Sequence, residues 1–145
     1  MIENPYPLKS FEDATRFIFV SIGAQKPVLK VVLFDQIEVN KWNLAFGDWS
    51  NNTVDDTAIT NNNDVAKVLV AVAQAVFAFS DKYPERTIVI IPVDDKRKRL
   101  YNLVFKRRRA EIGETFAIIG IRGKQVEPYH PDEEYDSFEL VRKNR

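Results

Sequence analysis

Runs of β-branched and aromatic residues recur through the N-terminal third of the chain. They cover residues 16–22 ("RFIFVSI"), 28–34 ("VLKVVLF") and 42–49 ("WNLAFGDW"). Such short runs, bounded by turn residues, are typical of strands. The pattern therefore predicts three strands joined by short turns. The Asn- and Asp-rich residues 50–64 then predict a polar loop, with an optional edge strand at 57–60.

A longer apolar segment predicts the first helix over residues 64–81. Its apolar side chains recur three and four positions apart and cover most of the helix circumference, so the helix should pack against a sheet. Residues 61–64 offer N-cap side chains, and Tyr83 followed by Pro84 should end the helix. The apolar positions are Val65, Val68, Leu69, Ala71, Val72, Ala75, Val76 and Phe79.

The second half of the chain predicts a strand, a helix and two more strands. The run "RTIVIIPV", residues 86–93, indicates a central strand that is buried on both faces. The second helix should cover about 95–111, with Asp94 or Asp95 as its N-cap. Strands are predicted at 115–121 and 137–141.

The fold class that follows is α+β, with a largely antiparallel sheet and two helices. The predicted order is βββ(β)αβαββ, in which early strands joined by short turns should form a meander. No linker or repeat divides the 145 residues, so we expect a single domain over 1–145. Residues 1–14 and 142–145 are expected to be flexible ends.

Composition limits the chemistry and the cellular location that we expect for the protein. The chain has no cysteine, which excludes disulfides and thiolate catalysis and favours a reducing cytoplasm. The N-terminus lacks the pattern of a signal peptide. The apolar stretch 68–79 contains Gln74 and is too short to span a bilayer, so we expect no membrane association.

Charge is distributed unevenly, although 21 basic and 21 acidic residues give a net charge of zero. Residues 94–109 ("DDKRKRLYNLVFKRRR") carry eight Lys or Arg against two Asp, a net charge of +6. The segments 47–64 and 127–139 carry acids and no Lys or Arg. A neutral chain is not a typical polyanion binder, and the acidic segments could instead cover the basic helix.

A helical wheel divides the basic segment into two faces. It places Leu100, Tyr101, Leu103, Val104 and Ala110 on one apolar face, opposite Lys98, Arg99, Asn102, Lys106 and Arg109. The wheel puts Arg97, Arg107 and Arg108 at the edge of the apolar face. An arginine there must pair with an acid, extend to solvent or enter a cleft, so these three could meet either protein carboxylates or phosphates.

Basic residues interleaved with aromatic ones favour nucleic-acid binding. A sheet with stacking rings beside a basic helix suits single-stranded DNA or RNA, although aromatics that alternate along strands also build cores. The candidate nucleic-acid-binding residues of the helix are Arg97, Lys98, Arg99, Tyr101, Lys106, Arg107, Arg108 and Arg109. The candidate sheet rings are Phe17, Phe19, Trp42, Phe46 and Trp49.

Two further positions carry possible chemistry. Asp48 follows Gly47 at a strand end, where a carboxylate could bind a metal with Asp55, Asp56 or Asp64, or simply form turns. His130 is the only histidine, too few for a His-based zinc cluster or a triad. A single-histidine nuclease stays open. No metal or other cofactor is indicated, and no reaction is assigned.

Several short motifs resemble a known family. "NLAFGD" (43–48), "NNND" before a Val/Ala helix ending in "FAF" (61–79), Pro84 and "KRLY" (98–101) are similar to a family of small uncharacterised proteins known mainly from Bacteroidetes. The resemblance spans about 15–140 and implies a bacterial cytoplasmic protein without an assigned catalytic residue. The order of elements also resembles whirly and PC4-type single-stranded-DNA-binding folds, a likeness of topology alone.

These observations predict a nucleic-acid-binding protein, with single-stranded DNA or RNA as the expected ligand. The alternative is a protein-interaction module or homodimer, for example one partner of a small operon-encoded pair, in which the basic helix meets an acidic surface such as segment 127–139 of a second copy. The second alternative is a small nuclease.

Overall fold

The computed structural model describes residues 6–23, 26–50, 53–55 and 65–143. The chain gathers into two compact units. Unit 1 consists of Met1–Asp35 and Leu44–Tyr83, and unit 2 of Gln36–Asn43 and Pro84–Arg145. The prediction of a single domain stays a prediction.

Unit 1 is built from a mostly antiparallel group of strands, in the order β1-β2-β3-β4, with β5 paired to β4. The turn from β2 to β3 brings Phe17 opposite Val32, so that apolar side chains of both strands share one face. The strands are β1 (Lys9–Phe11), β2 (Arg16–Ser21), β3 (Val28–Glu38), β4 (Lys41–Ser50) and β5 (Thr53–Asp55).

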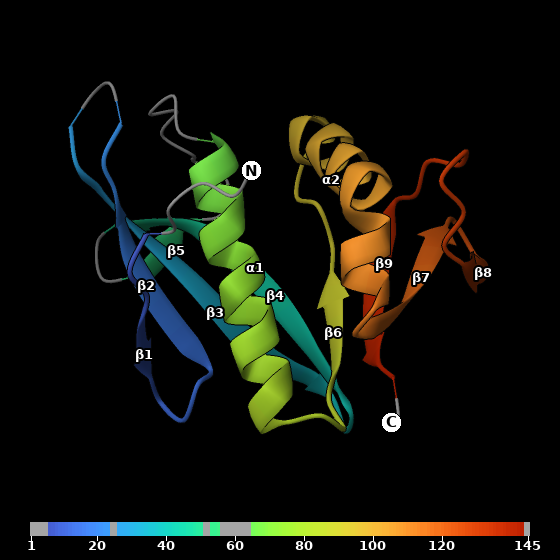
Figure 1. Cartoon of the computed structure of the whole chain (residues 1–145), viewed down its shortest axis with the longest axis horizontal. Helices are drawn as coiled ribbons and strands as arrows, with labels where there is room; N and C mark the ends of the chain where they lie inside the picture. Colours follow the sequence, from blue (N-terminus) through green and yellow to red (C-terminus); the bar gives the residue numbers. More distant parts are fainter. Residues whose placement is uncertain (1–5, 24–25, 51–52, 56–64, 144–145) are drawn as a thin grey trace. The chain divides into compact units, whose positions relative to one another are not determined.

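Helix α1 (Val65–Lys82) covers this apolar face, and Figure 1 shows it lying across the strands of unit 1. Phe79 of α1 stacks on Phe34 of β3, with ring centroids 4.1 Å apart. Phe19 stacks between Tyr6 and Phe46 in the same core. Five of the eight apolar positions that predicted this helix are buried, and Leu69 and Val72 are half-buried; the buried five are Val68, Ala71, Ala75, Val76 and Phe79.

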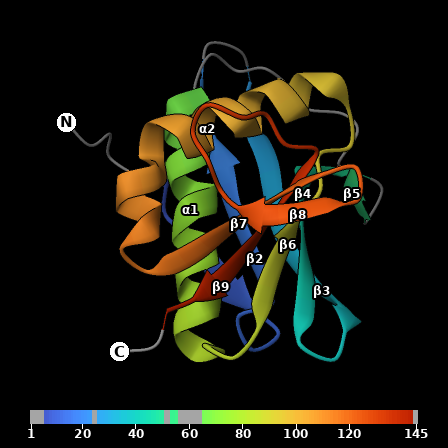
Figure 2. The ribbon, with the colours of Figure 1, turned by 90° about the vertical axis from the view of Figure 1, so that its right-hand side faces the viewer.

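Unit 2 contains the second group of strands, in the order β4-β6-β9-β7-β8. The first residues of β4, Lys41–Asn43, pair in parallel with β6, whereas the β6–β9, β9–β7 and β7–β8 pairs are antiparallel. Figure 2 shows β7 and β8 as a hairpin. The remaining elements are β6 (Thr87–Ile90), α2 (Asp95–Gly113), β7 (Phe116–Arg122), β8 (Gln125–Pro128) and β9 (Ser137–Arg142).

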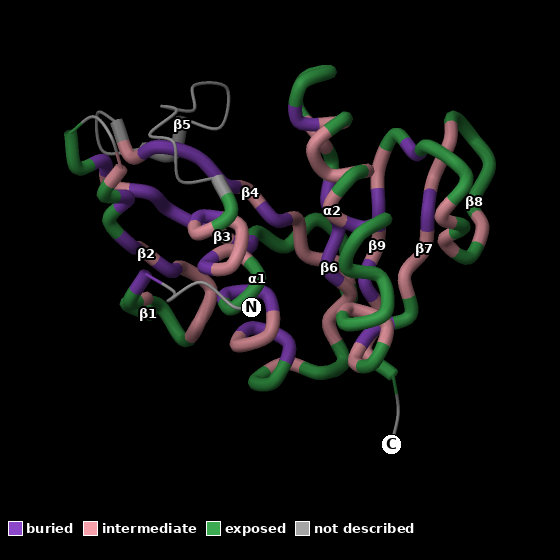
Figure 3. The backbone as a smooth tube through the Cα atoms, turned by 45° about the horizontal axis from the view of Figure 1, so that its top comes forward, coloured by how far each residue is buried: buried purple, intermediate pink, exposed green. Residues whose placement is uncertain are grey.

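The predicted α+β class, with two helices and a mostly antiparallel sheet, is confirmed for the described residues. Strand β6 is central and buried at Ile88–Ile90, as expected, but it ends there, and Ile91 and Val93 are exposed. Figure 3 shows buried, purple backbone in β6.

Three strands were not predicted. β1 lies in a segment expected to be a flexible end, β5 lies in the predicted polar loop 50–64, and β8 lies between the predicted strands 115–121 and 137–141. All three are short edge strands without an apolar period, so the pattern could not reveal them. β8 exists because Gly123, at a φ of +56°, closes a two-residue hairpin with β7. The predicted edge strand at 57–60 lies outside the described residues.

Candidate nucleic-acid interface

The basic helix α2 starts at a well-formed N-cap. Asp94 has extended backbone geometry, and its Oδ1 accepts a hydrogen bond from the Arg97 backbone N–H at 2.8 Å. The Asp94 carbonyl accepts from the Lys98 N–H. The side chain thus satisfies one of the free N–H groups of the first turn, as predicted for this aspartate.

One aromatic side chain anchors α2. Phe105 is buried and stacks on Phe138 of β9, with ring centroids 4.2 Å apart, and it also contacts Tyr129. Asn102 fixes the same side of the helix by accepting from the Tyr135 backbone N–H and donating to the Tyr135 carbonyl. The inner face of α2 is therefore set by Phe105 and Asn102.

The predicted apolar face of α2 is wrong in part. Leu103 is 42% exposed and Ala110 is exposed, whereas Asn102, assigned to the wet face, is half-buried. Leu103 lies two positions from Phe105 and so about 200° around the helix from it. The wheel was oriented by the leucines, but a buried ring that stacks on β9 decides the orientation.

The outward face of α2 carries a row of cations around Leu103. Lys96, Arg99, Lys106 and Arg107 are exposed and follow the helical period, and Arg109 is exposed nearby. Among the described residues, none of these five side chains forms an ion pair with a carboxylate. We call Lys96, Arg99, Leu103, Lys106 and Arg107 the basic stripe. Lys96 was not among the predicted site residues.

The other predicted site residues differ in their surroundings. Arg97 is buried and pairs with Asp94, Lys98 pairs with Asp136, and Tyr101 is half-buried. Arg107 and Arg108 are both exposed, and Arg108 pairs with Glu111. Of the three arginines that the wheel singled out, only Arg97 is enclosed.

The acidic segment 127–139 does not neutralise the basic stripe. Its acids pair elsewhere: Glu127 and Glu133 with Arg122, Glu139 with Lys41, and Asp136 with Lys98. The Lys98–Asp136 bond raises the pKa of the lysine and lowers that of the carboxyl. Within the described residues it is the one ion pair between α2 and this segment.

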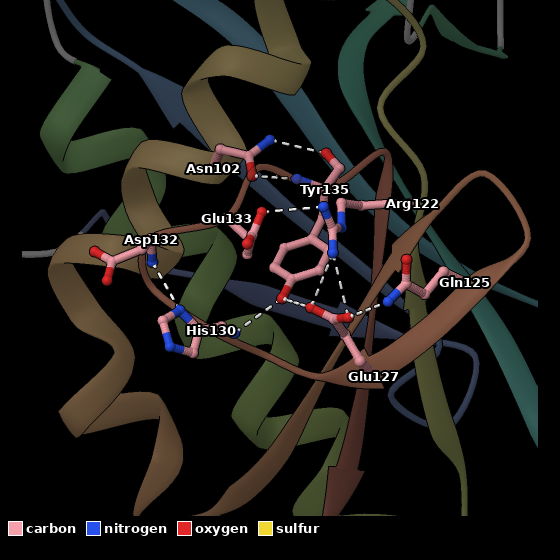
Figure 4. Close-up of polar contacts among 8 residues, drawn as sticks. All are labelled: Asn102, Arg122, Gln125, Glu127, His130, Asp132, Glu133 and Tyr135. Carbon is pink, nitrogen blue, oxygen red and sulfur yellow. Dashed lines mark hydrogen bonds and ion pairs between the residues drawn. The ribbon is translucent and has the colours of Figure 1, made fainter.

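A buried tyrosine organises the acidic segment, as Figure 4 shows. The Tyr135 ring is fully buried, and its hydroxyl donates to Glu127 Oε2 at 2.6 Å while accepting from the His130 N–H. A side chain at Gly120 of β7 would overlap this ring, so glycine makes room for it. Burial raises the pKa of Tyr135, and the hydrogen bond from Tyr135 lowers the pKa of Glu127.

Arg122 completes this cluster by joining two acids. Its Nη1 donates to Glu133 and its Nη2 to Glu127, and Gln125 also donates to Glu127. The cluster was not predicted from the sequence. Its only signal was a single arginine before a segment with six acids, a pattern that many surface loops share.

Three of the five candidate stacking rings lie in the core of unit 1. Phe17, Phe19 and Phe46 are buried, whereas Trp42 and Trp49 are half-buried. Arg86 stacks on the Trp42 ring, 4.0 Å from its centroid. The buried phenylalanines account for the alternating pattern of the strands and leave little ring surface for bases.

Asp48 is engaged in the core of unit 1. Its Oδ1 lies 2.6 Å from Nζ of Lys30, a side chain that is 1% exposed. No group of three or more potential metal ligands occurs among the described residues, and Asp56 and Asp64 lie outside them. His130 is exposed, and its Nδ1 accepts from the Asp132 N–H.

Residues 2–143 match the model of a family of unknown function, DUF6934. The chain therefore belongs to this family. No curated protein and no solved structure matches the chain. Neither described helix has the length and apolar character needed to cross a membrane.

Proposed function

We propose that the protein binds nucleic acid through the basic stripe of α2, which contacts the phosphate backbone. The observation that carries the proposal is the exposure of Lys96, Arg99, Lys106 and Arg107 on one face, without ion pairs to carboxylates of the described residues. A cation without an internal partner can neutralise a phosphate, and this releases the counterion that was condensed on the nucleic acid.

The geometry supports recognition of phosphates more than stacking of bases. Tyr101 lies about 200° around the helix from Leu103 and so is not part of the stripe. Binding should therefore depend strongly on salt and weakly on sequence. Single-stranded DNA or RNA is the ligand we expect, in line with the similarity of element order to whirly and PC4-type folds. A bacterial cytoplasm is the setting that this proposal assumes.

The test is titration of fluorescent single-stranded and duplex oligonucleotides over a series of salt concentrations. The stripe and Arg109 offer five exposed cations. The logarithm of affinity should fall with the logarithm of salt with a slope of up to about −3.5 for single strands and about −4.5 for duplexes. No binding at low salt, or a slope near zero, would exclude the proposal.

A matched pair of double variants assigns the binding to the stripe. Arg99→Gln with Lys106→Gln removes two charges from one face of α2. Lys9→Gln with Lys124→Gln removes two exposed charges elsewhere. The first pair should reduce the slope for single strands by about 1.4, and the second should leave it unchanged. Equal effects of both pairs would show that only the net charge matters.

One observation favours a second candidate function, an acidic protein partner. Leu103 lies in the middle of the stripe and would give a protein partner an apolar contact among the charges. A second copy of the chain fits this role less well, because four of the six acids in 127–139 already pair internally. Leu103→Ala should weaken a protein complex and leave oligonucleotide binding unchanged.

A further inference from the structure

Arg97 is a charged side chain enclosed by the protein, with 5% of its surface exposed. Its Nη1 lies 2.6 Å from Oδ2 of Asp94, the N-cap residue of α2. The guanidinium is therefore at the N-terminus of this 19-residue helix. The partial positive charge of the helix terminus and the arginine act at the same place.

The Asp94 pair uses only part of the guanidinium. Nε and Nη2 of Arg97 are buried and have no hydrogen-bond partner. A buried donor of a charged group that loses water without gaining a partner is costly, and such donors are rare in folded proteins. Packing alone does not explain why an arginine occupies this position.

The two nitrogens without a partner, Nε and Nη2, lie on the same edge of the guanidinium. An arginine presents its N–H groups in a rigid planar fork, and Nε with one terminal nitrogen forms an edge that matches two oxygens of an oxyanion. The atoms without a partner in Arg97 are such a pair of nitrogens, while the third is occupied by Asp94.

Arg122 shows that one guanidinium of this chain can serve two acidic groups. Its Nη1 donates to Glu133 and its Nη2 to Glu127. Arg122 is partly exposed and finds both acids within the acidic segment. Arg97 has found one acid, and among the described residues no second carboxylate reaches it.

We propose that Arg97 binds a phosphate group through Nε and Nη2 at the N-terminus of α2. Helix N-termini and arginine forks are both common phosphate-binding elements. Asp94 and Asp95 oppose an anion there, which suits a moderate affinity. The phosphate can be free inorganic phosphate or the terminal phosphate of a larger ligand. This site does not depend on the basic stripe.

The direct test follows the side-chain Nε–H resonance of Arg97 by NMR in the full-length, ¹⁵N-labelled protein. Inorganic phosphate is titrated at constant ionic strength, with chloride in exchange. Arg97→Lys assigns the resonance by its disappearance. A saturable shift of this resonance, with little change at Arg108, is the expected result. No shift, or a shift shared by every exposed arginine, would overturn the proposal.

Thermal unfolding in phosphate provides a second measurement. Phosphate stabilises most proteins by exclusion from their surface, so the informative quantity is the saturable difference between the wild type and Arg97→Lys. Lysine keeps the charge but cannot form two parallel hydrogen bonds, and the apparent affinity should fall about tenfold or more. An equal response of both proteins would count against the site. If the variant does not fold, through-bond correlation to the backbone in ¹³C,¹⁵N-labelled wild-type protein assigns the Arg97 resonance, and the wild-type titration decides.

Further titrations identify the ligand of Arg97 and distinguish this site from oligonucleotide binding by the basic stripe. A 5′-phosphorylated oligonucleotide that shifts Arg97 more than its 5′-hydroxyl counterpart would indicate a terminal phosphate, and equal effects would indicate free phosphate. Acetate that binds as well as phosphate would overturn the phosphate assignment. The Arg99→Gln, Lys106→Gln variant should lose oligonucleotide binding and keep the shift caused by inorganic phosphate, so either proposal can fail alone.

Discussion

The two helices have nearly equal lengths and opposite relations to their surroundings. α1 buries Val68, Ala71, Ala75 and Phe79, and Phe79 stacks on Phe34 of β3. α2 buries only Arg97 and Phe105. The sequence of α1 is explained by the core that it completes, because nearly every apolar position meets a neighbour. Most of the sequence of α2 is not explained in that way.

The difference indicates where to look for function. Only two side chains of α2 are buried, yet the helix places basic residues over its exposed surface and one of the two buried side chains is an arginine. Side chains that add nothing to packing but share charge and position are typical of binding surfaces. Variants in the two helices can test whether this distinction is real.

The largest effect is expected for Phe79→Ala in α1. Phe79 is fully buried between Phe34 and Tyr83, and its loss should reduce the free energy of unfolding by about 4 kcal/mol. The chain has one tryptophan in each unit, Trp49 in unit 1 and Trp42 in unit 2. In a Trp42→Phe background, urea unfolding followed by Trp49 fluorescence reports on unit 1. An unchanged midpoint would contradict the role of α1.

Phe105→Ala should follow, at about 3 kcal/mol, because one stacked ring anchors α2. Here the measurement uses a Trp49→Phe background, so that Trp42 reports on unit 2. A loss below about 1 kcal/mol would show that contacts other than the Phe105–Phe138 stack hold α2. Comparison with Phe79→Ala also shows whether each tryptophan responds to its own helix.

Tyr135→Phe should cost about 1–2 kcal/mol, since the hydroxyl bonds Glu127 and the His130 N–H. The Tyr135 bond holds the pKa of Glu127 below its ordinary value of 4.5. Glu127 therefore stabilises the fold above that pH, and this contribution is lost as the pH falls through the lower folded pKa. Urea midpoints between pH 3 and 7 should thus depend less on pH in the variant. Equal pH dependence would argue against the coupling.

The smallest effect is expected for Leu103→Ala, which should change the free energy of unfolding by less than about 0.5 kcal/mol because the side chain lies on the exposed face. Leu100→Ala, at a half-buried position one turn earlier, serves as the matched control and should cost more. A loss above about 2 kcal/mol for Leu103→Ala would show that the stripe is packed after all.

Much of the fold could be predicted because its helices and inner strands carry strong periodic patterns. The α1 stripe, the Asp94 cap and the apolar strand before it were all found from residue types alone. The orientation of α2 could not be found in this way. Its Leu and Val outnumber its single Phe, and only the stack on Phe138, 33 residues away, shows which face turns inward. The basic segment was predicted from residue types. That Arg97 pairs with one carboxylate and leaves Nε and Nη2 without a partner depends on side-chain geometry, which residue types do not show.

The parallel pairing of β4 with β6 has a consequence for synthesis. Lys41–Asn43 belong to unit 2 but are synthesised before the second part of unit 1, Leu44–Tyr83, and their partners start 46 residues later at Thr87. At about 5–20 residues per second, the interval is roughly two to nine seconds. During it this strand segment lacks its β6 neighbour, and an unpaired strand is open to association with other chains. Slow translation before Thr87 would therefore lengthen the time for which Lys41–Asn43 lack a partner strand. The codon usage of residues 44–86 is then expected to affect the yield of folded protein.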